Sequence, residues 1–186
     1  AQAAKLLASG QGADMESFRK RPGSVEWTAI EESLFKALDS EAAHEKAAKL
    51  FDDIGYADFY IKELNKKSRW DKAIALDKLA RLRCTKAVPE VITALSSTER
   101  DVRNMAVYCL GVIGDGRAIP HLMERLRKAA QLQEDSSIRI VKSSLISFAE
   151  KAGPYLTEEI RNPSWQVRAA AVDVLGEIQC EDAKKG

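Results

Sequence analysis

Histidine and cysteine are scarce in this chain, and their scarcity excludes several kinds of chemistry. There are two histidines, His44 and His121, and three widely spaced cysteines, Cys84, Cys109 and Cys180. Structural zinc sites use four closely spaced Cys or His ligands, so neither residue type supplies a metal centre here. An odd number of distant cysteines argues against a disulfide framework and favours reduced thiols. Nothing places a histidine beside a cysteine as a nucleophilic pair needs. We therefore predict no catalytic residue, no metal and no cofactor.

Charge of one sign and long apolar runs are lacking as well. The formal net charge is +1, which gives no electrostatic argument for nucleic acid or for an anionic membrane surface. No apolar run approaches the roughly 20 residues that span a bilayer, and no signal peptide is recognisable. Aromatic residues make up 6% of a chain rich in Ala, Leu, Lys and Glu, a composition that favours helices. The chain begins at Ala1 rather than Met, which is consistent with a fragment of a longer protein.

What the sequence does contain is a repeated pattern. The stretch "DVRNMAVYCLGVIGDGRAIPHLMERL", from Asp101 to Leu126, matches the stretch that begins at Asp71 after a shift of 31 residues. Related stretches begin at positions 138 and 167. Counted from Asp71, Val102, Ile138 and Val167, the spacings between the four starts are 31, 36 and 29 residues. Self-similarity at such a period is typical of a solenoid.

Each repeat is predicted to be a helical hairpin. The first helix follows a capping residue in three repeats, with Glu99 at the equivalent place in the remaining one; the three are Ser68, Asp135 and Ser164. Proline at the first turn of the second helix costs no hydrogen bond, and it occurs at Pro89, Pro120 and Pro154. Small residues that allow close helix packing are Ala75, Ala106 and Ala171. The expected buried positions are Leu79, Leu110, Ile146 and Leu175.

The predicted fold is all-α, a right-handed α-solenoid with a helical N-terminal cap. We expect a poorly ordered lead-in over residues 1–22, a cap over 23–67, and repeats over 68–186. The cap begins at Ser24 as an N-cap, and Gly55 ends one of its helices. The repeats span residues 68–97, 98–133, 134–162 and 163–186. The third has a Ser-rich face and a corner two residues shorter. The fourth lacks its second helix, which leaves an apolar face exposed unless another segment or a partner covers it.

The second repeat resembles HEAT repeats of the short bacterial kind, the PBS-lyase-type HEAT-like repeats. The resemblance extends over residues 68–183 and rests on Val102-Arg103, Ala106, Leu110-Gly111, Ile113-Gly114-Asp115, Arg117-Ala118-Ile119-Pro120 and Leu122. Residues 47–82 are similar to a class of bacterial HEAT-repeat proteins, on Ile54-Gly55-Tyr56, Tyr60, Arg69 and Trp70. In that class a single membrane helix often lies upstream and leaves the solenoid in the cytosol. This resemblance implies a cytoplasmic location, with a membrane contact only through an anchor outside this chain.

Several classes of enzyme share this kind of repeat, and each needs residues that can be looked for in this chain. Deoxyhypusine hydroxylase uses several His-Glu pairs to hold two irons, and the single pair His44-Glu45 excludes that activity. Phycobilin lyases bind a tetrapyrrole, and no aromatic-lined or acid-bearing cluster supports that function here. HEAT-like DNA glycosylases are the stronger alternative, because they use basic residues with a Trp or Tyr, and this chain has Trp70, Trp165 and many basic residues. Yet both tryptophans lie at the starts of first helices, where a large ring more often covers the end of the hairpin. Residues 69–186, however, contain 19 Lys and Arg against 16 Asp and Glu, little excess for a surface that follows phosphates.

A basic residue recurs one position after each repeat start. The four are Lys72, Arg103, Arg139 and Arg168. They could form a ladder for an anionic ligand, but recurrence at one repeat position favours a structural role in bonding helix ends and neighbouring repeats.

The function predicted from the sequence is non-catalytic protein–protein interaction or scaffolding on the concave surface. Second helices of stacked hairpins line that surface, where extended partners bind. The candidate partner-binding residues are Glu90, Thr93, His121, Glu124, Arg125, Tyr155, Glu158 and Glu159. The partner is predicted to be a protein, whose identity the sequence does not give. The alternative function is a nucleic-acid-directed enzyme or binder of the DNA glycosylase type.

Overall fold

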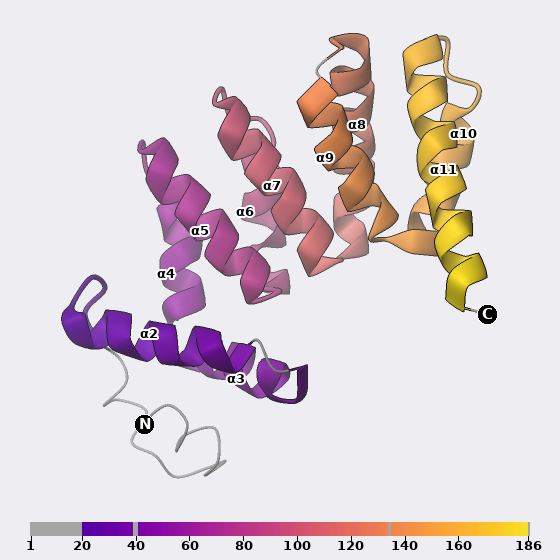
Figure 1. The fold of residues 1–186 in the computed structure, drawn as a ribbon. Coiled ribbons are helices and arrows are strands. Elements are labelled where there is room, and N and C mark those ends of the chain that lie inside the picture. The colour runs from indigo at the N-terminus through magenta and orange to yellow at the C-terminus, as the bar shows by residue number, and fades with distance from the viewer. Residues whose placement is uncertain (1–19, 39–40, 134, 186) are drawn as a thin grey trace. The chain divides into compact units, whose positions relative to one another are not determined.

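A computed structural model describes residues 20–38, 41–133 and 135–185, and the side chains within them except those of 41–43, 135 and 179–185. The described residues form helices and no strand (Figure 1). The chain divides into two compact units, residues 1–87 and 88–186. Within the described ranges, no helix has the length and apolarity needed to cross a membrane. The predicted lead-in, residues 1–22, lies outside the described residues except for its last three.

Unit 1, residues 1–87, contains four α-helices within its described residues, 20–38 and 41–87. They are α2 (Val25–Leu38), α3 (Glu41–Asp53), α4 (Tyr56–Glu63) and α5 (Arg69–Arg81), followed by the short 3-10 helix η2 (Thr85–Ala87). The predicted N-cap at Ser24 is confirmed, because its Oγ accepts the backbone N–H of Trp27 at 3.1 Å. Gly55 has φ 83°, a left-handed conformation that suits glycine, and it separates α3 from α4 as predicted.

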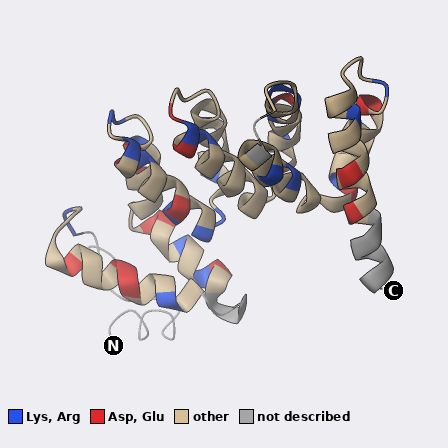
Figure 2. Ribbon diagram, turned by 45° about the horizontal axis from the view of Figure 1, so that its top comes forward, with Lys and Arg blue, Asp and Glu red and all other residues tan. Residues whose placement is uncertain are grey.

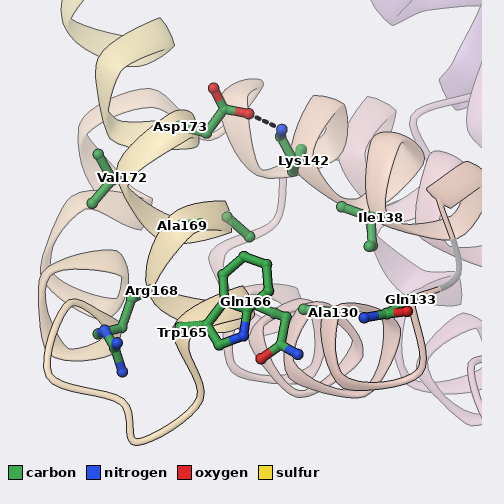
Figure 3. Close-up of a pocket in the computed structure, with 11 residues that line it drawn as sticks. Ala130, Gln133, Ile138, Lys142, Trp165, Gln166, Arg168, Ala169, Val172 and Asp173 are labelled. Atoms are coloured by element: carbon green, nitrogen blue, oxygen red, sulfur yellow. Dashed lines mark hydrogen bonds and ion pairs between the residues drawn. The ribbon is translucent and has the colours of Figure 1, made fainter.

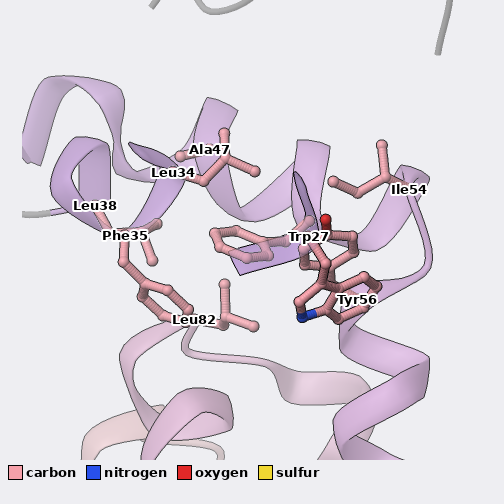
Figure 4. Close-up of a cluster of buried hydrophobic side chains, with 9 residues drawn as sticks. Trp27, Leu34, Phe35, Leu38, Ala47, Ile54, Tyr56 and Leu82 are labelled. Carbon is pink, nitrogen blue, oxygen red and sulfur yellow. The ribbon is translucent and has the colours of Figure 1, made fainter. Parts of the chain in front are cut away.

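The core of unit 1 is aromatic at its centre (Figure 4). Trp27 of α2 stacks on Tyr56 at the start of α4, with ring centroids 3.4 Å apart. Phe51 of α3 is fully buried and meets Tyr56 edge-on, with centroids 5.7 Å apart. Ala47 of α3 and Ile54, which follows this helix, are buried in the same core.

Charged side chains border this core where α2 and α5 meet. Lys78 and Arg81 of α5 lie over the ring of Phe35, with the cation 4.2 and 4.4 Å from its centroid. Lys78 also lies 3.6 Å from the carboxylate of Glu31. Burial raises the pKa of Glu31, and the nearby Lys78 opposes that rise without cancelling it. His44 donates from Nε2 to the backbone carbonyl of Arg81 at 3.1 Å, so one of the two histidines has a structural bond.

Unit 2, residues 88–186, is built from alternating first and second helices of hairpins. Its helices are α6 (Val88–Ala94), α7 (Arg100–Ile113), α8 (Ile119–Gln131), α9 (Asp135–Ile146), α10 (Gly153–Glu159) and α11 (Trp165–Lys185), with 3-10 turns η3 (Gly116–Ala118) and η4 (Ala149–Ala152). The first helices α7, α9 and α11 lie side by side in one layer, and the second helices α6, α8 and α10 form a layer behind them (Figure 1). Pro89, Pro120 and Pro154 occupy the first turns of the second helices, as predicted.

Of the helix caps predicted for the repeats, one is confirmed and two are not. Ser68 is confirmed as the N-cap of α5, since its Oγ accepts the backbone N–H of Asp71 at 3.3 Å. Ser164 precedes α11, but its hydroxyl donates to the side chain of Gln166 at 2.8 Å instead of accepting a backbone N–H. Asp135 is already the first residue of α9 and is not its N-cap; the side chain of Asp135 lies outside the described residues.

The alignment of the third repeat is off by one residue. Val141 and Leu145 of α9 are buried at the positions that Ala106 and Leu110 occupy in α7, which gives a shift of 35 residues and not 36. Ile146, the predicted core residue, is only half-buried. The second helices are related by a shift of 34 residues, from Pro120 to Pro154, while the first helices are related by a shift of 35. The corner between the two helices of the third repeat is therefore one residue shorter, and not two.

The serines of α9 explain why the third repeat looked degenerate. Ser144 is buried and donates to the carbonyl of Val107 at 3.1 Å, and Ser147 donates to the carbonyl of Gly111 at 2.9 Å. A Cβ added at Gly111 would lie 2.8 Å from the Cβ of Ser144. The absence of a side chain at Gly111 therefore lets α7 and α9 approach closely enough for the serines to reach the helix carbonyls.

Helix α11 extends from Trp165 through Lys185, so Cys180 lies within it. The side chain of Cys180 lies outside the described residues. The other two cysteines have no disulfide; Cys109 is fully buried in α7, as a small packing residue would be, and Cys84 lies at the corner after α5.

Candidate functional site

The predicted partner-binding residues all lie on the second helices of unit 2. Five of them are exposed, namely Thr93, His121, Glu124, Tyr155 and Glu158. Glu90 and Arg125 are half-buried. Glu159 was expected to face outward, but it is buried, with 5% of its surface exposed. Its burial does not fit the prediction that Glu159 belongs to an outward-facing binding surface.

Glu159 is buried because it joins two second helices. The Nε of Arg127 on α8 donates to the Oε1 of Glu159 at 2.8 Å, and the Nη2 of Arg127 lies 2.6 Å from the same oxygen. The other carboxylate oxygen accepts from the side-chain amide of Asn162 at 2.7 Å. Burial by itself would raise the pKa of Glu159, but the bonds from Arg127 and Asn162 outweigh it and lower that pKa. The pair stabilises the contact between α8 and α10 and leaves Glu159 unavailable to a partner.

The exposed surface of the second helices carries more acids than bases among its predicted residues. Glu124 is exposed on α8 and pairs with Lys128, while Glu158 is exposed on α10. Figure 2 shows acidic and basic residues mixed along the helices, without a continuous basic strip in that view. Carboxylates on this face repel phosphates, so the arrangement does not favour a nucleic acid as its ligand.

The recurring basic residues of unit 2 have a structural role in two cases. The Nη1 of Arg103 donates to the carbonyls of Ser97 and Thr98 at 3.0 and 2.9 Å. The Nη1 of Arg168 bonds the equivalent carbonyls, those of Asn162 and Pro163, at 2.8 and 2.9 Å. Each guanidinium thereby holds the loop before its own helix; no bond from these two residues to an acid of the adjacent repeat is seen.

Arg139 does not belong to this set. The corrected shift of 35 residues makes Ile138 the counterpart of Arg103, so Arg139 falls one position away and is exposed. The interpretation of the recurring cations as architecture is thus supported for Arg103 and Arg168 only.

A groove lies between α9 and α11 in unit 2 (Figure 3). Its volume is about 960 Å³. Its lining comes from the end of α8 and from α9 and α11: Ala130, Gln133, Ile138, Lys142, Trp165, Gln166, Arg168, Ala169, Ala170, Val172 and Asp173. Lys142 of α9 and Asp173 of α11 form an ion pair across one end of it.

Trp165 gives the groove its chemical character. The indole stands at the first turn of α11, with 63% of its surface exposed, and it points into the space between the two helices (Figure 3). Ile138 and Ala169 provide apolar surface beside it, and Gln133 and Gln166 provide amide groups. The sequence prediction that a tryptophan here covers the end of its hairpin is therefore incorrect, since most of the ring faces solvent.

The sequence contained a signal for this groove that went unused. Trp165 follows Pro163-Ser164 at the start of a helix, away from the positions that carry the repeat's apolar residues. A large aromatic outside the core pattern is a candidate for a binding surface. The partners of Trp165 in the groove could not be found in the same way, because they depend on the corrected position of α9.

The remaining chemistry-bearing residues do not assemble into a site. Among the described side chains, no group of three or more His, Cys, Asp or Glu residues is placed to hold a metal ion. Burial raises the pKa of the Cys84 thiol, which disfavours the reactive thiolate. Trp70 is exposed at the start of α5 in unit 1, with the guanidinium of Arg69 5.0 Å from its ring centroid.

Comparison with known proteins supports the architecture. Residues 57–138 match the family model described as HEAT repeats. Among solved structures, the chain is similar to the complex of CpcE and CpcF of phycocyanin lyase from Nostoc sp. PCC7120, with a TM-score of 0.51 and 21% identity over 82% of this chain and 66% of that one. It is also similar to an engineered protein, with a TM-score of 0.50 and 19% identity over 97% of both chains. A search of curated proteins finds no match.

Stacked hairpins of this kind define an α-helical repeat protein with an all-α solenoid fold, as the sequence predicted. Over residues 57–138 the repeats are HEAT repeats. The likeness to the two solved structures shows the fold alone. The right hand of the solenoid stays a prediction.

Proposed function

We propose that unit 2 is a non-catalytic module that binds a protein partner. The observation that carries the proposal is Trp165, a mostly exposed indole that lines an apolar-walled groove between two packed helices. Tryptophan is enriched among the residues that dominate protein–protein binding energies, because one rigid ring can bury a large area. A partner side chain that entered the groove would cover Trp165 and Ile138 together, and the Lys142–Asp173 ion pair would form a polar rim.

The fold adds support by analogy. HEAT-like helical repeats commonly present surfaces to extended partners. The similar Nostoc structure is itself a complex of two proteins, CpcE and CpcF. On this analogy the exposed residues of the second helices, Thr93, His121, Glu124, Tyr155 and Glu158, extend the binding surface beyond the groove.

The proposal that the module is not an enzyme rests on its side chains. The groove contains one carboxylate, that of Asp173, and it is paired with Lys142. General acid–base catalysis needs a group that can exchange a proton with a substrate at the working pH, and a carboxylate bound to a lysine is poorly suited to that task. His121 lies on α8 and does not line the groove.

Replacement of Trp165 tests the proposal, and the chain offers a matched control. Trp70 is equally exposed, at 68%, and also stands at the first turn of a first helix, but it lies in unit 1. Tagged wild-type protein, Trp165→Ala and Trp70→Ala would be recovered from cells that express the gene naturally, after nuclease treatment, and quantified by mass spectrometry. We expect a partner protein whose recovery falls about tenfold or more with Trp165→Ala and stays unchanged with Trp70→Ala.

Two results would contradict this function. One is a partner set that neither substitution alters. The other is nucleic acid as the main co-purified material before nuclease treatment, with every protein lost after it.

A further inference from the structure

The groove between α9 and α11, called the Trp165 groove below, offers mainly hydrogen-bond donors. The indole of Trp165 carries one N–H group and no acceptor. The side-chain carbonyl of Gln166 already accepts from the hydroxyl of Ser164 at 2.8 Å. What Gln166 offers to a ligand is therefore its amide N–H groups. Both side chains line the groove, so a ligand that enters it meets donors on the α11 side.

The charged groups of the lining do not reverse this balance. Lys142 binds the carboxylate of Asp173, the one acidic side chain among the lining residues. Arg168 directs its Nη1 to two backbone carbonyls of the loop before α11. Only the amide of Gln133 adds a side-chain carbonyl that is not already engaged in this way. A ligand that satisfies the groove must therefore bring acceptors.

The apolar part of the groove is a flat ring beside compact aliphatic side chains. Trp165 is 63% exposed, and Ile138 and Ala169 lie beside it (Figure 3). Ile138 stands where α7 has Arg103, the cation that holds the loop before α7. The third repeat thus replaces a cation by an aliphatic residue at this position, which makes the α9 side of the groove apolar. A ligand must combine its acceptors with a compact apolar body.

The groove faces outward at positions that stay open inside the repeat array. At the shift of 65 residues that relates α7 to α11, Trp165 corresponds to Arg100. By the same shift, Asp173 corresponds to Tyr108. Arg100 and Tyr108 are both exposed although α9 packs against α7. A hairpin following α11 in the same way would leave the groove open. It would cover Val172, whose counterpart on α7 is buried, so Val172 is left out of the proposed surface.

We propose that the Trp165 groove binds a proline-rich segment of the partner protein in the polyproline II conformation. The inference rests on the proposed function and names the chemistry of the partner. Proline has no backbone N–H, so a run of prolines offers carbonyl acceptors and needs no acceptor from the groove. The carbonyls of a polyproline II helix make no internal hydrogen bonds, so they are available to donors such as Gln166. Pyrrolidine rings supply the compact apolar body and pack on aromatic surfaces.

The length of the groove suits a short segment of this kind. From Trp165 to Asp173 the axis of α11 advances about 12 Å, at roughly 1.5 Å per residue. A polyproline II helix rises about 3.1 Å per residue, so about four residues span this length. Prolines at every third position lie on the same edge of such a helix. One proline can thus cover Trp165 while the next contacts Ile138 and Ala169.

Other occupants fit the lining less well. An acidic segment also brings acceptors, but the face of an indole ring is electron-rich and Asp173 repels a second carboxylate. A cationic side chain is attracted to the ring face, but it meets Lys142 and Arg168 in the same lining. A helix bonds its own carbonyls internally, so it would leave the donors of Trp165 and Gln166 without partners.

Nuclear magnetic resonance locates the binding, with the full chain labelled with ¹⁵N and decaproline as the probe. The chain has three tryptophans, so three indole N–H signals are expected. Trp27 is buried, and Trp70 is exposed in unit 1. We expect decaproline to shift the Trp165 signal in a saturable way and to leave the signals of Trp27 and Trp70 in place.

Fluorescence anisotropy of fluorescein-labelled decaproline gives the affinities of the variants. Trp165→Ala should weaken binding by about tenfold or more, and Trp70→Ala should leave it within about twofold. Gln166→Glu replaces the amide donors by a carboxylate, so it should weaken binding by about fivefold or more. Gln131→Glu is the matched control, because Gln131 is exposed, lies outside the lining and undergoes the same change of charge. Its affinity should stay within about twofold.

Three results would overturn the proline-rich assignment. They are the absence of saturable decaproline binding, binding that Trp165→Ala leaves unchanged, and tighter binding of an oligoarginine or oligoglutamate of the same length. The recovery of natural partners tests the proposed function separately. If that recovery depends on Trp165 while decaproline fails to bind, the protein-binding function stands and only the proline-rich assignment is withdrawn. If the recovery does not depend on Trp165, the proposed function fails whatever decaproline does.

Discussion

Single residues set the closeness of packing in unit 2, and Gly111 is the sharpest case. An added Cβ at Gly111 would meet the Cβ and Oγ of Ser144 at 2.8 Å and its Cα at 3.0 Å. One of these contacts is with the backbone of α9, so a rotamer change of Ser144 cannot relieve all of them. Either α9 must move away or its serines must lose their bonds to the carbonyls of α7.

Gly111→Ala is therefore expected to destabilise the protein relative to Gly176→Ala. Both changes replace glycine in a helix by a better helix former, which favours folding by about 1 kcal/mol in each case. Only Gly111→Ala adds the overpacking, which costs about 1–3 kcal/mol. Urea unfolding followed by circular dichroism measures the difference. Equal midpoints for the two variants would show that α7 and α9 separate without cost.

The residue-level predictions that the structure confirms concern local roles, although the caps predicted at Asp135 and Ser164 show that not every local prediction was correct. The capping bonds of Ser24 and Ser68 and the left-handed Gly55 follow from backbone geometry within a few positions, so a sequence pattern contains them. The burial of Glu159 depends instead on Arg127, a residue 32 positions away on another helix. No spacing rule within one helix could have indicated that this acid faces inward.

At the scale of the elements, ion pairs and hydroxyls link successive helices in addition to the apolar residues. The Arg127–Glu159 pair joins α8 to α10, and the side chain of Glu159 is only 6% exposed. Arg127 is 43% exposed, so water partly screens the pair and reduces its net contribution. Loss of the cation nonetheless leaves a buried carboxylate with Asn162 as its remaining partner.

Arg127→Ala should lower the free energy of unfolding by about 1–2 kcal/mol at neutral pH, the lower end for a buried pair because of that exposure. Lys128→Ala is the matched control, since Lys128 makes an exposed pair with Glu124 four residues earlier in the same helix. Such pairs contribute about 0.2–0.5 kcal/mol. Chemical denaturation of the two variants measures the contrast, and equal losses would contradict a specific role for Arg127.

The pH dependence of the Arg127 variant provides its second readout. The folded wild-type protein holds the pKa of Glu159 below its ordinary value, so the pair's stabilisation is present above the unfolded pKa and is lost as pH falls through the folded pKa. The difference in stability between wild type and Arg127→Ala should therefore narrow in acid, below about pH 4. A difference that stayed constant from neutral pH into acid would point to lost packing of the Arg127 stem instead of lost charge.

The register of α9 shows how far an element can be placed from sequence. Its existence and its position in a hairpin were predicted correctly, because the helix falls between the preceding repeat and Pro154 at the start of the next helix. Its alignment was wrong by one residue, because serines at buried positions do not resemble the apolar residues of the other repeats. Only the structure shows that Ser144 and Ser147 face carbonyls that can accept their bonds.

For the whole molecule, the fold class was the most predictable feature and the candidate binding site the least. The same helical pattern recurs in several repeats, so a misalignment in one of them does not change the predicted all-α solenoid. The groove around Trp165 arises where α9 and α11 pack less closely than α7 and α9, and it has no counterpart in the pattern of one repeat. Departures from the repeat were therefore the informative positions for function.

The electrostatics of the whole chain lead to the last expectation, which concerns nucleic acid. The net charge is +1, and the predicted second-helix surface bears exposed Glu124 and Glu158. A protein that neutralises several phosphates binds more weakly as the salt concentration rises. The logarithm of its binding constant falls linearly with the logarithm of the salt concentration, with a slope of about −0.9 per phosphate contact. We expect the full chain to give no saturable anisotropy change with a short labelled DNA duplex or single strand at low salt. Saturable binding with a steep salt dependence, weakened by Trp165→Ala, would instead assign the groove to a nucleic acid, because an exposed indole also serves as a platform for stacked bases.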